Sequence, residues 1–224
     1  MGYGTALTPA LLLAGLSPLK IVPAVMVSQL AGDIVVSIFH HRLGNANFKL
    51  GSVELHVALI LGCSGILAPL VASLVALRLS GMVIKYYVAA MTTIIGLFLL
   101  SNKRIRGRLS RGKALLLSLI AGFNKGLTGG GYGPLIAGGQ VILGAEARSA
   151  VAITALAEGL TCTVATVVYY LSGTIDVSIA GPMTLGTILS APLAAMTIKR
   201  SGSVRIRKLM GLAALGLGLA CLIC

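Results

Sequence analysis

Residues 124–134 read Asn-Lys-Gly-Leu-Thr-Gly-Gly-Gly-Tyr-Gly-Pro, with five glycines and one lysine in an otherwise apolar part of the chain. Clustered glycine lets the backbone turn sharply and approach a ligand closely, and proline suits the first turn of a helix. The flanking apolar segments, Ala114–Phe123 and Pro134–Leu143, are short. At 1.5 Å per residue each reaches roughly half way through a 30 Å hydrocarbon core. The stretch therefore predicts the tip of a broken or re-entrant helix near the middle of a bilayer.

The composition of the 224-residue chain is that of a membrane protein. Hydrophobic residues make up 57% of it, charged residues only 10%, and its mean hydropathy is +1.00. A soluble domain has about 25% charged residues. Collagen-like, disulfide-stapled and disordered chains are excluded, because the glycines have no three-residue period, there are only four cysteines, and the apolar fraction is high. The long apolar runs do not alternate as outer-membrane strands do, so we predict an all-α polytopic membrane protein.

The chain reads as two related halves. A shift of 129 positions places Gly2-Tyr3-Gly4 on Gly131-Tyr132-Gly133 without a gap, and a later six-residue shortening aligns residues 68–70 with 191–193. We interpret this as two repeats, residues 1–101 and 113–224, joined by a basic linker at 102–112. The first repeat has no counterpart of residues 113–130, so its N-terminal half-hairpin is expected to be missing. Each repeat is predicted to hold one Gly-rich re-entrant or broken helix, plus three of the six spanning runs Pro18–Phe39, Val53–Leu77, Met82–Leu100, Ala147–Tyr170, Val177–Ile198 and Leu209–Cys224.

The 18 Lys and Arg residues, set against five Asp and Glu, indicate the orientation of the repeats. Eleven of these cations fall within residues 103–113 and 199–208, and such clusters favour the cytoplasmic side. If residues 114–143 form a hairpin that does not cross, 14 cations are cytoplasmic and three are external. Each repeat then crosses three times, so the second is inverted relative to the first. A nucleic-acid partner is disfavoured, because no basic domain with interleaved aromatic residues is present.

The glycine run predicts an anion site. The unpaired N–H groups at a helix start, with the helix dipole behind them, attract anions. The alternative is that Gly122, Gly126 and Gly130 merely allow close helix packing, since they have small-xxx-small spacing. A lysine at this depth needs a partner or a purpose. Lys125 is open to three interpretations: it pairs with Glu158, it neutralises an anionic substrate, or it extends to the cytoplasmic surface.

Glu158 and Gln29 occupy equivalent positions, 129 residues apart. Each lies on a polar stripe of its helix, Glu158 with Thr154, Thr161 and Cys162, and Gln29 with Asp33. An intramembrane carboxylate is usually functional, although an interhelical hydrogen bond is the simpler role. The residues that we expect to bind substrate are Gly2, Tyr3, Gly4, Thr5, Gln29, Asp33, Asn124, Lys125, Thr128, Gly130, Gly131, Tyr132, Gly133, Glu158, Thr161 and Cys162.

We expect no catalytic residue, metal site or cofactor. His40, His41 and His56 lie near a predicted helix end, without an accompanying acidic or cysteine cluster. The chain also has no nucleotide-binding loop, so transport driven by its own ATPase is excluded.

Several stretches resemble a known family. They are the Gly-Tyr-Gly with its following half-helix at 2–13, the helix end His-His-Arg-Leu-Gly at 40–44, and the region from Tyr-Leu-Ser-Gly at 170–173 through Ala-Pro-Leu at 191–193 to residues 205–211. Together they resemble the TauE/SafE sulfite exporter family over nearly the whole chain. The resemblance implies a multipass carrier of sulfite, sulfonates or related sulfur-containing organic anions, commonly moved outward. The missing first half-hairpin departs from the family pattern. Lys125 and Glu158 come from the residues alone and not from this resemblance.

The leading hypothesis is a secondary transporter of small sulfur-containing anions in the cell (inner) membrane. The substrate would lie between the two Gly-rich tips, bound by backbone N–H groups of residues 131–135 and their counterparts near Gly4. Lys125 would add charge, and Glu158 is a hypothetical site of proton coupling. An anion channel with the same tips as a filter is the alternative, and a membrane enzyme or assembly factor that uses the His and Cys residues is a third. The expected partners are the substrate anion and the lipid bilayer, and a homodimer is kept as a hypothesis.

Overall fold

The structure is a computed structural model that describes residues 2–101, 111–200 and 203–223. Every regular element in these three ranges is an α-helix, ten in all, which confirms the all-helical prediction. The predicted linker at 102–112 and its cations at 103–108 fall almost entirely outside the described residues.

Four of the described helices are long and apolar enough to cross a membrane: α2 (Pro18–Arg42), α5 (Gly81–Leu100), α8 (Ala147–Leu171) and α9 (Val177–Arg200). Helices α3 (Val53–Ser64) and α4 (Leu67–Ala76) make a fifth span if the pair, bent by 40°, is counted as one. The other helices are α1 (Tyr3–Leu13), α6 (Arg111–Thr128), α7 (Tyr132–Ile142) and α10 (Ser203–Ile223). The apolar stretch Lys208–Ile223 of α10 nearly coincides with the predicted run Leu209–Cys224, and it is shorter than the four long spans.

The predicted run Val53–Leu77 is broken in the structure. Helix α3 ends at Ser64 and α4 begins at Leu67. Pro69 lies in the first turn of α4, where a missing N–H group is harmless. The break lies at Gly65, where an added Cβ would lie 3.1 Å from the Ser118 carbonyl oxygen of α6. The chain therefore bends where two backbones approach each other closely.

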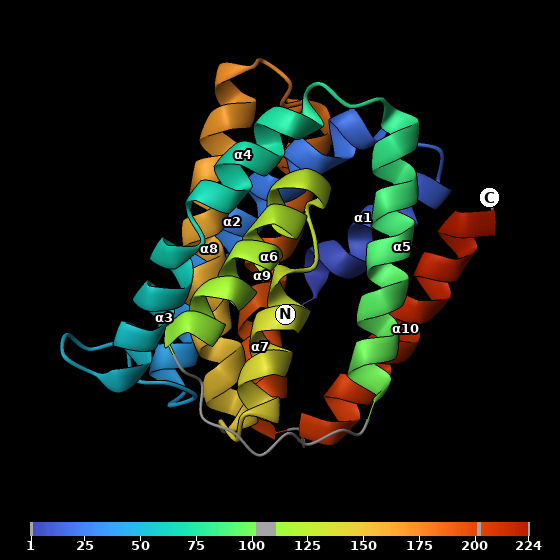
Figure 1. The fold of residues 1–224 in the computed structure, drawn as a ribbon. Coiled ribbons are helices and arrows are strands. Elements are labelled where there is room, and N and C mark those ends of the chain that lie inside the picture. Colours follow the sequence, from blue (N-terminus) through green and yellow to red (C-terminus); the bar gives the residue numbers. More distant parts are fainter. Residues whose placement is uncertain (1, 102–110, 201–202, 224) are drawn as a thin grey trace.

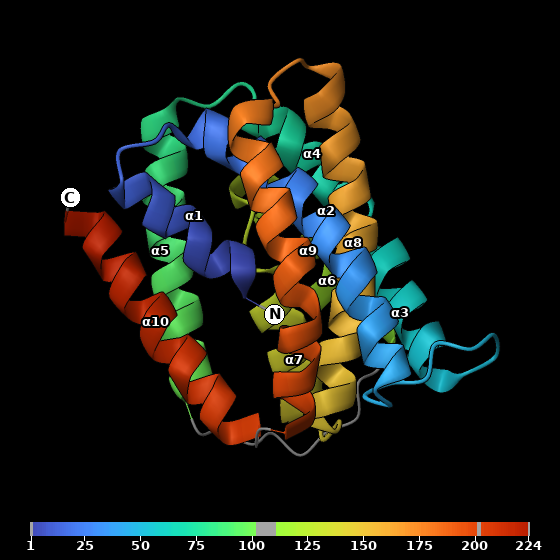
Figure 2. The same cartoon turned by 180° about the vertical axis from the view of Figure 1, so that it is seen from behind.

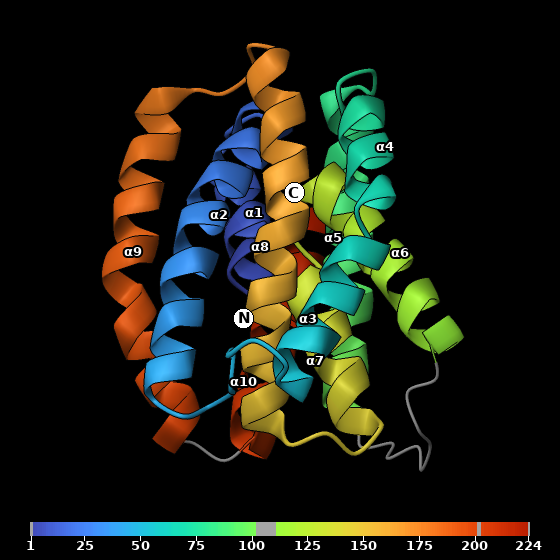
Figure 3. The ribbon, with the colours of Figure 1, turned by 90° about the vertical axis from the view of Figure 1, so that its left-hand side faces the viewer.

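Helices α2 and α8 pack against each other in the centre of the molecule and run in opposite directions (Figures 1 and 3). Helix α9 covers α2, while α3 and α4 lie along α8 and α6. Helices α5 and α10 form a pair on the other side (Figure 2). Helix α1 starts near mid-height and ends at the upper end, whereas α6 rises from the lower half and α7 returns to the lower end (Figure 1).

Candidate functional site

The N-terminal tips of α1 and α7 meet inside the molecule. Their N-cap residues, Gly2 and Gly131, have φ of 79° and 85°, and neither offers a side-chain cap. These left-handed conformations suit glycine. The backbone N–H of Gly131 donates to the Thr5 hydroxyl at 2.9 Å. A Cβ on Gly130 would lie 2.9 Å from the Gly4 carbonyl carbon, so glycine allows the two backbones to touch.

Lys125 lies directly beside these tips and is fully buried. Its ammonium group donates to Glu158 Oε1 at 2.7 Å, to the Gly129 carbonyl oxygen at 3.2 Å and to Gln29 Oε1. A lysine ammonium has three N–H groups, and each has an acceptor here. Of the three interpretations of Lys125, the structure shows pairing with Glu158 and not extension to the surface.

Gln29 and Glu158 join α2 to α8. The Gln29 amide donates to Glu158 Oε1 at 3.0 Å, and both side chains are buried. A second contact links Asp33 to Cys162, whose thiol lies 3.9 Å from the Asp33 carboxylate. Both contacts join residues 129 positions apart. The residues that the sequence pattern pairs as equivalents are therefore neighbours in space.

The structure places the other predicted residues in two groups. Thr128 caps the turn between α6 and α7, because its hydroxyl donates to the Asn124 carbonyl at 2.7 Å and accepts from the Gly130 N–H at 3.1 Å. The Tyr3 hydroxyl lies 3.3 Å from Ser28 Oγ. Tyr132 and Thr161 contact other parts of the fold: the Tyr132 hydroxyl donates to the Leu61 carbonyl oxygen of α3, and the Thr161 hydroxyl to the Glu158 carbonyl oxygen of its own helix.

Comparison with known proteins identifies the family of this chain. The model for "Sulfite exporter TauE/SafE" matches residues 1–221. The chain belongs to the TauE/SafE sulfite exporter family. No curated protein and no solved structure matches it. Family membership and the apolar helices make the chain a multipass membrane protein of a transporter family, as the sequence predicted.

Two tyrosines that the sequence analysis missed support the site of this TauE/SafE family member. The Tyr87 hydroxyl of α5 donates to Asn124 Oδ1 at 2.5 Å, which fixes the orientation of that amide. The Tyr169 hydroxyl of α8 donates to the Gly126 carbonyl oxygen at 2.7 Å, near the end of α6. Both residues lie in predicted spanning runs, where sequence alone gives no sign of such long-range contacts.

The glycines of α6 also serve packing, as the alternative interpretation proposed. A Cβ on Gly122 would lie 3.0 Å from Pro69, and one on Gly126 would lie 2.8 Å from the Ala72 Cβ of α4. Gly130 instead faces the backbone of the α1 tip. The small-residue spacing thus joins α6 to α4 along its length and to α1 at its end.

The polar stripes extend further than the sequence analysis found. Ser37 follows Asp33 by one turn on α2, and its equivalent Thr166 follows Cys162 on α8. Both hydroxyl oxygens are buried, and neither has a hydrogen-bond partner among the described residues. His40 comes next on α2, with its Nδ1 2.8 Å from the Asn45 amide nitrogen, which also donates to the Ala195 carbonyl at 3.0 Å.

Among the described residues, no group of three or more His, Cys, Asp or Glu side chains is placed to hold a metal ion.

Proposed function

We propose that this protein is a secondary transporter that exports small sulfur-containing anions, such as sulfite or sulfonates, across the cell (inner) membrane by alternating access. The observation that carries the proposal is the position of Lys125, a buried cation at the point where the tips of α1 and α7 meet. A helix N-terminus attracts anions through its unpaired N–H groups and its dipole. Two such tips beside one ammonium group bring together donors that a small oxyanion requires, and an anion would displace the Thr5 hydroxyl from the Gly131 N–H.

The ion pair implies how a proton would be coupled. Glu158 already neutralises Lys125, so an entering anion must compete with the Glu158 carboxylate for the ammonium group. Protonation of Glu158 removes its negative charge and leaves Lys125 free to pair with the anion. The loaded site then holds one substrate anion and one added proton, and the two cross together.

The arrangement of the helices supports inverted repeats, residues 1–101 and 113–224, as the basis of alternating access. Helices α1 and α7 have 11 residues each, α2 and α8 have 25 each, and the members of each pair begin 129 positions apart. The members of each pair run in opposite directions in Figure 1. Equivalent residues touch at Gln29–Glu158 and Asp33–Cys162, as expected beside a two-fold axis. Halves of this kind rock around a fixed central site in many transporters.

Flux in proteoliposomes tests the proposal. We expect saturable export of sulfite or a simple sulfonate, accelerated by substrate on the opposite side and by a lower pH on the side that the anion leaves. Lys125→Ala should abolish flux, while Lys20→Ala, a surface cation on α2, should leave it unchanged. Equal flux in the wild type and Lys125→Ala would refute the assigned site. Conductance that does not saturate in electrical recordings would instead support the alternative function, an anion channel with the same tips as its filter.

A further inference from the structure

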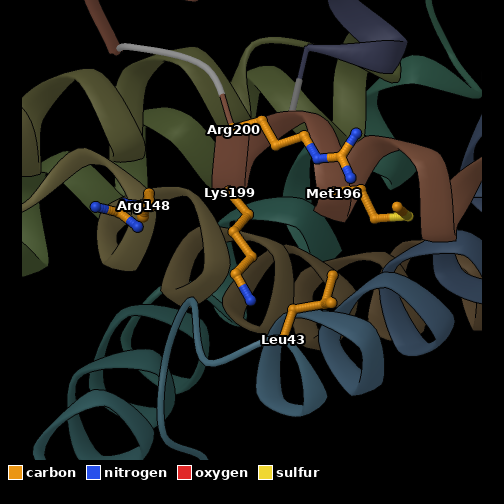
Figure 4. A pocket seen from close by; sticks show the side chains of 5 residues that line it. All are labelled: Leu43, Arg148, Met196, Lys199 and Arg200. Carbon is orange, nitrogen blue, oxygen red and sulfur yellow. The ribbon is translucent and has the colours of Figure 1, made fainter.

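A pocket opens at the lower end of the molecule, away from the tips. It has a volume of about 340 Å³ and is lined by Leu43, Arg148, Met196, Lys199 and Arg200. These residues come from the ends of three helices, since Leu43 follows α2, Arg148 lies in the first turn of α8, and the other three lie in the last turns of α9. In Figure 4, Lys199 extends toward Leu43, Arg200 extends over Met196, and Arg148 lies on the other side of Lys199.

The charge of this pocket is only partly compensated. Arg148 pairs with Glu146 at 3.0 Å, and both side chains are more than half exposed. The described residues form three ion pairs, and neither Lys199 nor Arg200 takes part in one. The pocket also adjoins the start of α8, where the helix dipole favours negative charge, and the ends of α2 and α9, where it favours the cations that are present. The net charge of its lining thus suits an anion.

An apolar stripe on α9 leads into the pocket. Leu185, Leu189, Leu193 and Met196 are spaced by four, four and three residues, so they share one face of the helix. Their exposed fractions are 64%, 75%, 65% and 38%. The 11 helical steps from Leu185 to Met196 span about 16 Å, roughly half of a 30 Å hydrocarbon core. A ligand bound in the pocket can therefore lay a hydrocarbon chain along α9 within one leaflet.

We propose that this pocket binds the phosphate headgroup of an anionic phospholipid, whose acyl chain lies along the exposed stripe of α9. Basic pockets between transmembrane helices are suited to anionic headgroups. A soluble anion such as sulfite would use the cations but not the apolar stripe, which is why we assign a lipid. The proposed orientation places the pocket on the cytoplasmic side, although the lipid site does not depend on the transport function.

Native mass spectrometry and thermal melting of the purified full chain test this site. We expect phosphatidylglycerol to be retained and to raise the melting temperature more than phosphatidylcholine does. The double variant Lys199→Gln/Arg200→Gln should weaken binding of phosphatidylglycerol about tenfold or more, at roughly 1 kcal/mol for each lost cation. The control Lys49→Gln/Lys208→Gln removes the same charge from exposed residues outside the pocket and should bind as the wild type does.

Two further comparisons, with soluble anions and with a neutral lipid, identify the ligand. Inorganic phosphate and sulfite, added at millimolar concentration, should not displace phosphatidylglycerol. Displacement by either would show a site for soluble anions and overturn the lipid assignment. Equal weakening in the two double variants would also overturn it, because general surface charge would then explain the binding. Equal retention of phosphatidylcholine would show that the cations do not select the headgroup.

Discussion

Gln29 and Glu158 lie 129 positions apart, contact each other at 3.0 Å, and both accept a hydrogen bond from Lys125. They occupy equivalent positions in the two predicted repeats, yet one is a neutral amide and the other is an acid. Acids at both positions would place two negative charges beside one lysine. Among the described residues, Glu158 is the one carboxylate in direct contact with the lysine, so the charge of this contact is balanced without the substrate.

Removing the charges of this pair separately and together should separate its structural role from its transport role. Lys125→Met leaves the Glu158 carboxylate buried without its cation, which should lower the free energy of unfolding by about 3–5 kcal/mol. Lys125→Met/Glu158→Gln removes both charges and should recover most of that loss, but not transport. Thermal melting in detergent and sulfite flux measure the two effects. A double variant that transports at the wild-type rate would show that the pair is purely structural.

Glu158→Gln alone should uncouple transport from protons. The neutral amide mimics protonated Glu158 and leaves Lys125 free for the anion at every pH. We expect anion exchange to continue, while a proton gradient no longer drives net flux. Internal pH dyes and sulfite assays measure both in one vesicle preparation. Glu54→Gln, at the start of α3, is the matched control. Unchanged proton-driven flux in Glu158→Gln would exclude this residue as the coupling group.

Gly130→Ala should disturb the contact between the tips. The added methyl group would lie 2.9 Å from the Gly4 and Thr5 backbone, so one tip must shift. A loss of only 1.4 kcal/mol in substrate binding would raise the apparent KM about tenfold, and we expect at least this change. Gly216→Ala, which meets no atom within 4 Å, should transport normally. Similar KM values for the two variants would show that the tip contact does not shape the site.

Tyr87→Phe tests whether the orientation of Asn124 matters. The substitution removes one hydroxyl and its 2.5 Å hydrogen bond to Asn124. A hydrogen bond contributes about 0.5–1.5 kcal/mol, so KM should rise about two- to tenfold, with little change in the maximal rate. The neighbouring Tyr86 is 53% exposed, and Tyr86→Phe should leave KM unchanged. A fall in maximal rate alone, at constant KM, would contradict a role in binding.

Asp176 should make a small acid-sensitive contribution to stability. A hydrogen bond from the Ser178 hydroxyl, assisted by Lys20, lowers the pKa of the Asp176 carboxyl below its usual range. A carboxyl whose pKa is lowered on folding stabilises the protein above its unfolded pKa, and this contribution is lost as the pH falls through the folded pKa. Asp176→Asn should therefore melt slightly below the wild type at pH 7, and the difference should vanish at strongly acidic pH. A difference that persists there would contradict the electrostatic explanation.

Much of the fold could be predicted from the sequence, because the length and hydropathy of an apolar run indicate a spanning helix. The predicted run Ala147–Tyr170 differs from α8 by one residue. Predicted ends fell short where helices continue into polar residues, as at Arg42 and Arg200. The break at Gly65 could not be predicted, because it depends on the close approach of α6.

The candidate site was predictable in outline and not in its contacts. The 129-residue shift aligned Gln29 with Glu158, and the depth of Lys125 required a partner. The choice among its three interpretations needed the folded chain, since the distance between α6 and α8 is not encoded in local spacing. The same holds for Tyr87 and Tyr169, whose hydroxyls act on α6 from helices far away in sequence.

The broken pair α3–α4 and the unbroken α9 occupy corresponding places in the two predicted repeats. The first half therefore contains a helix pair with a break, and the second half contains one continuous helix at the corresponding place. We expect α4 to tilt with α6 at this break, whereas α9 contains Pro182 and Pro192 but has no break between its ends. Unequal halves of this kind should make the carrier a rectifier, whose rate depends on the face from which the anion arrives. Vesicles with the protein inserted in one orientation would then fill and empty at different speeds.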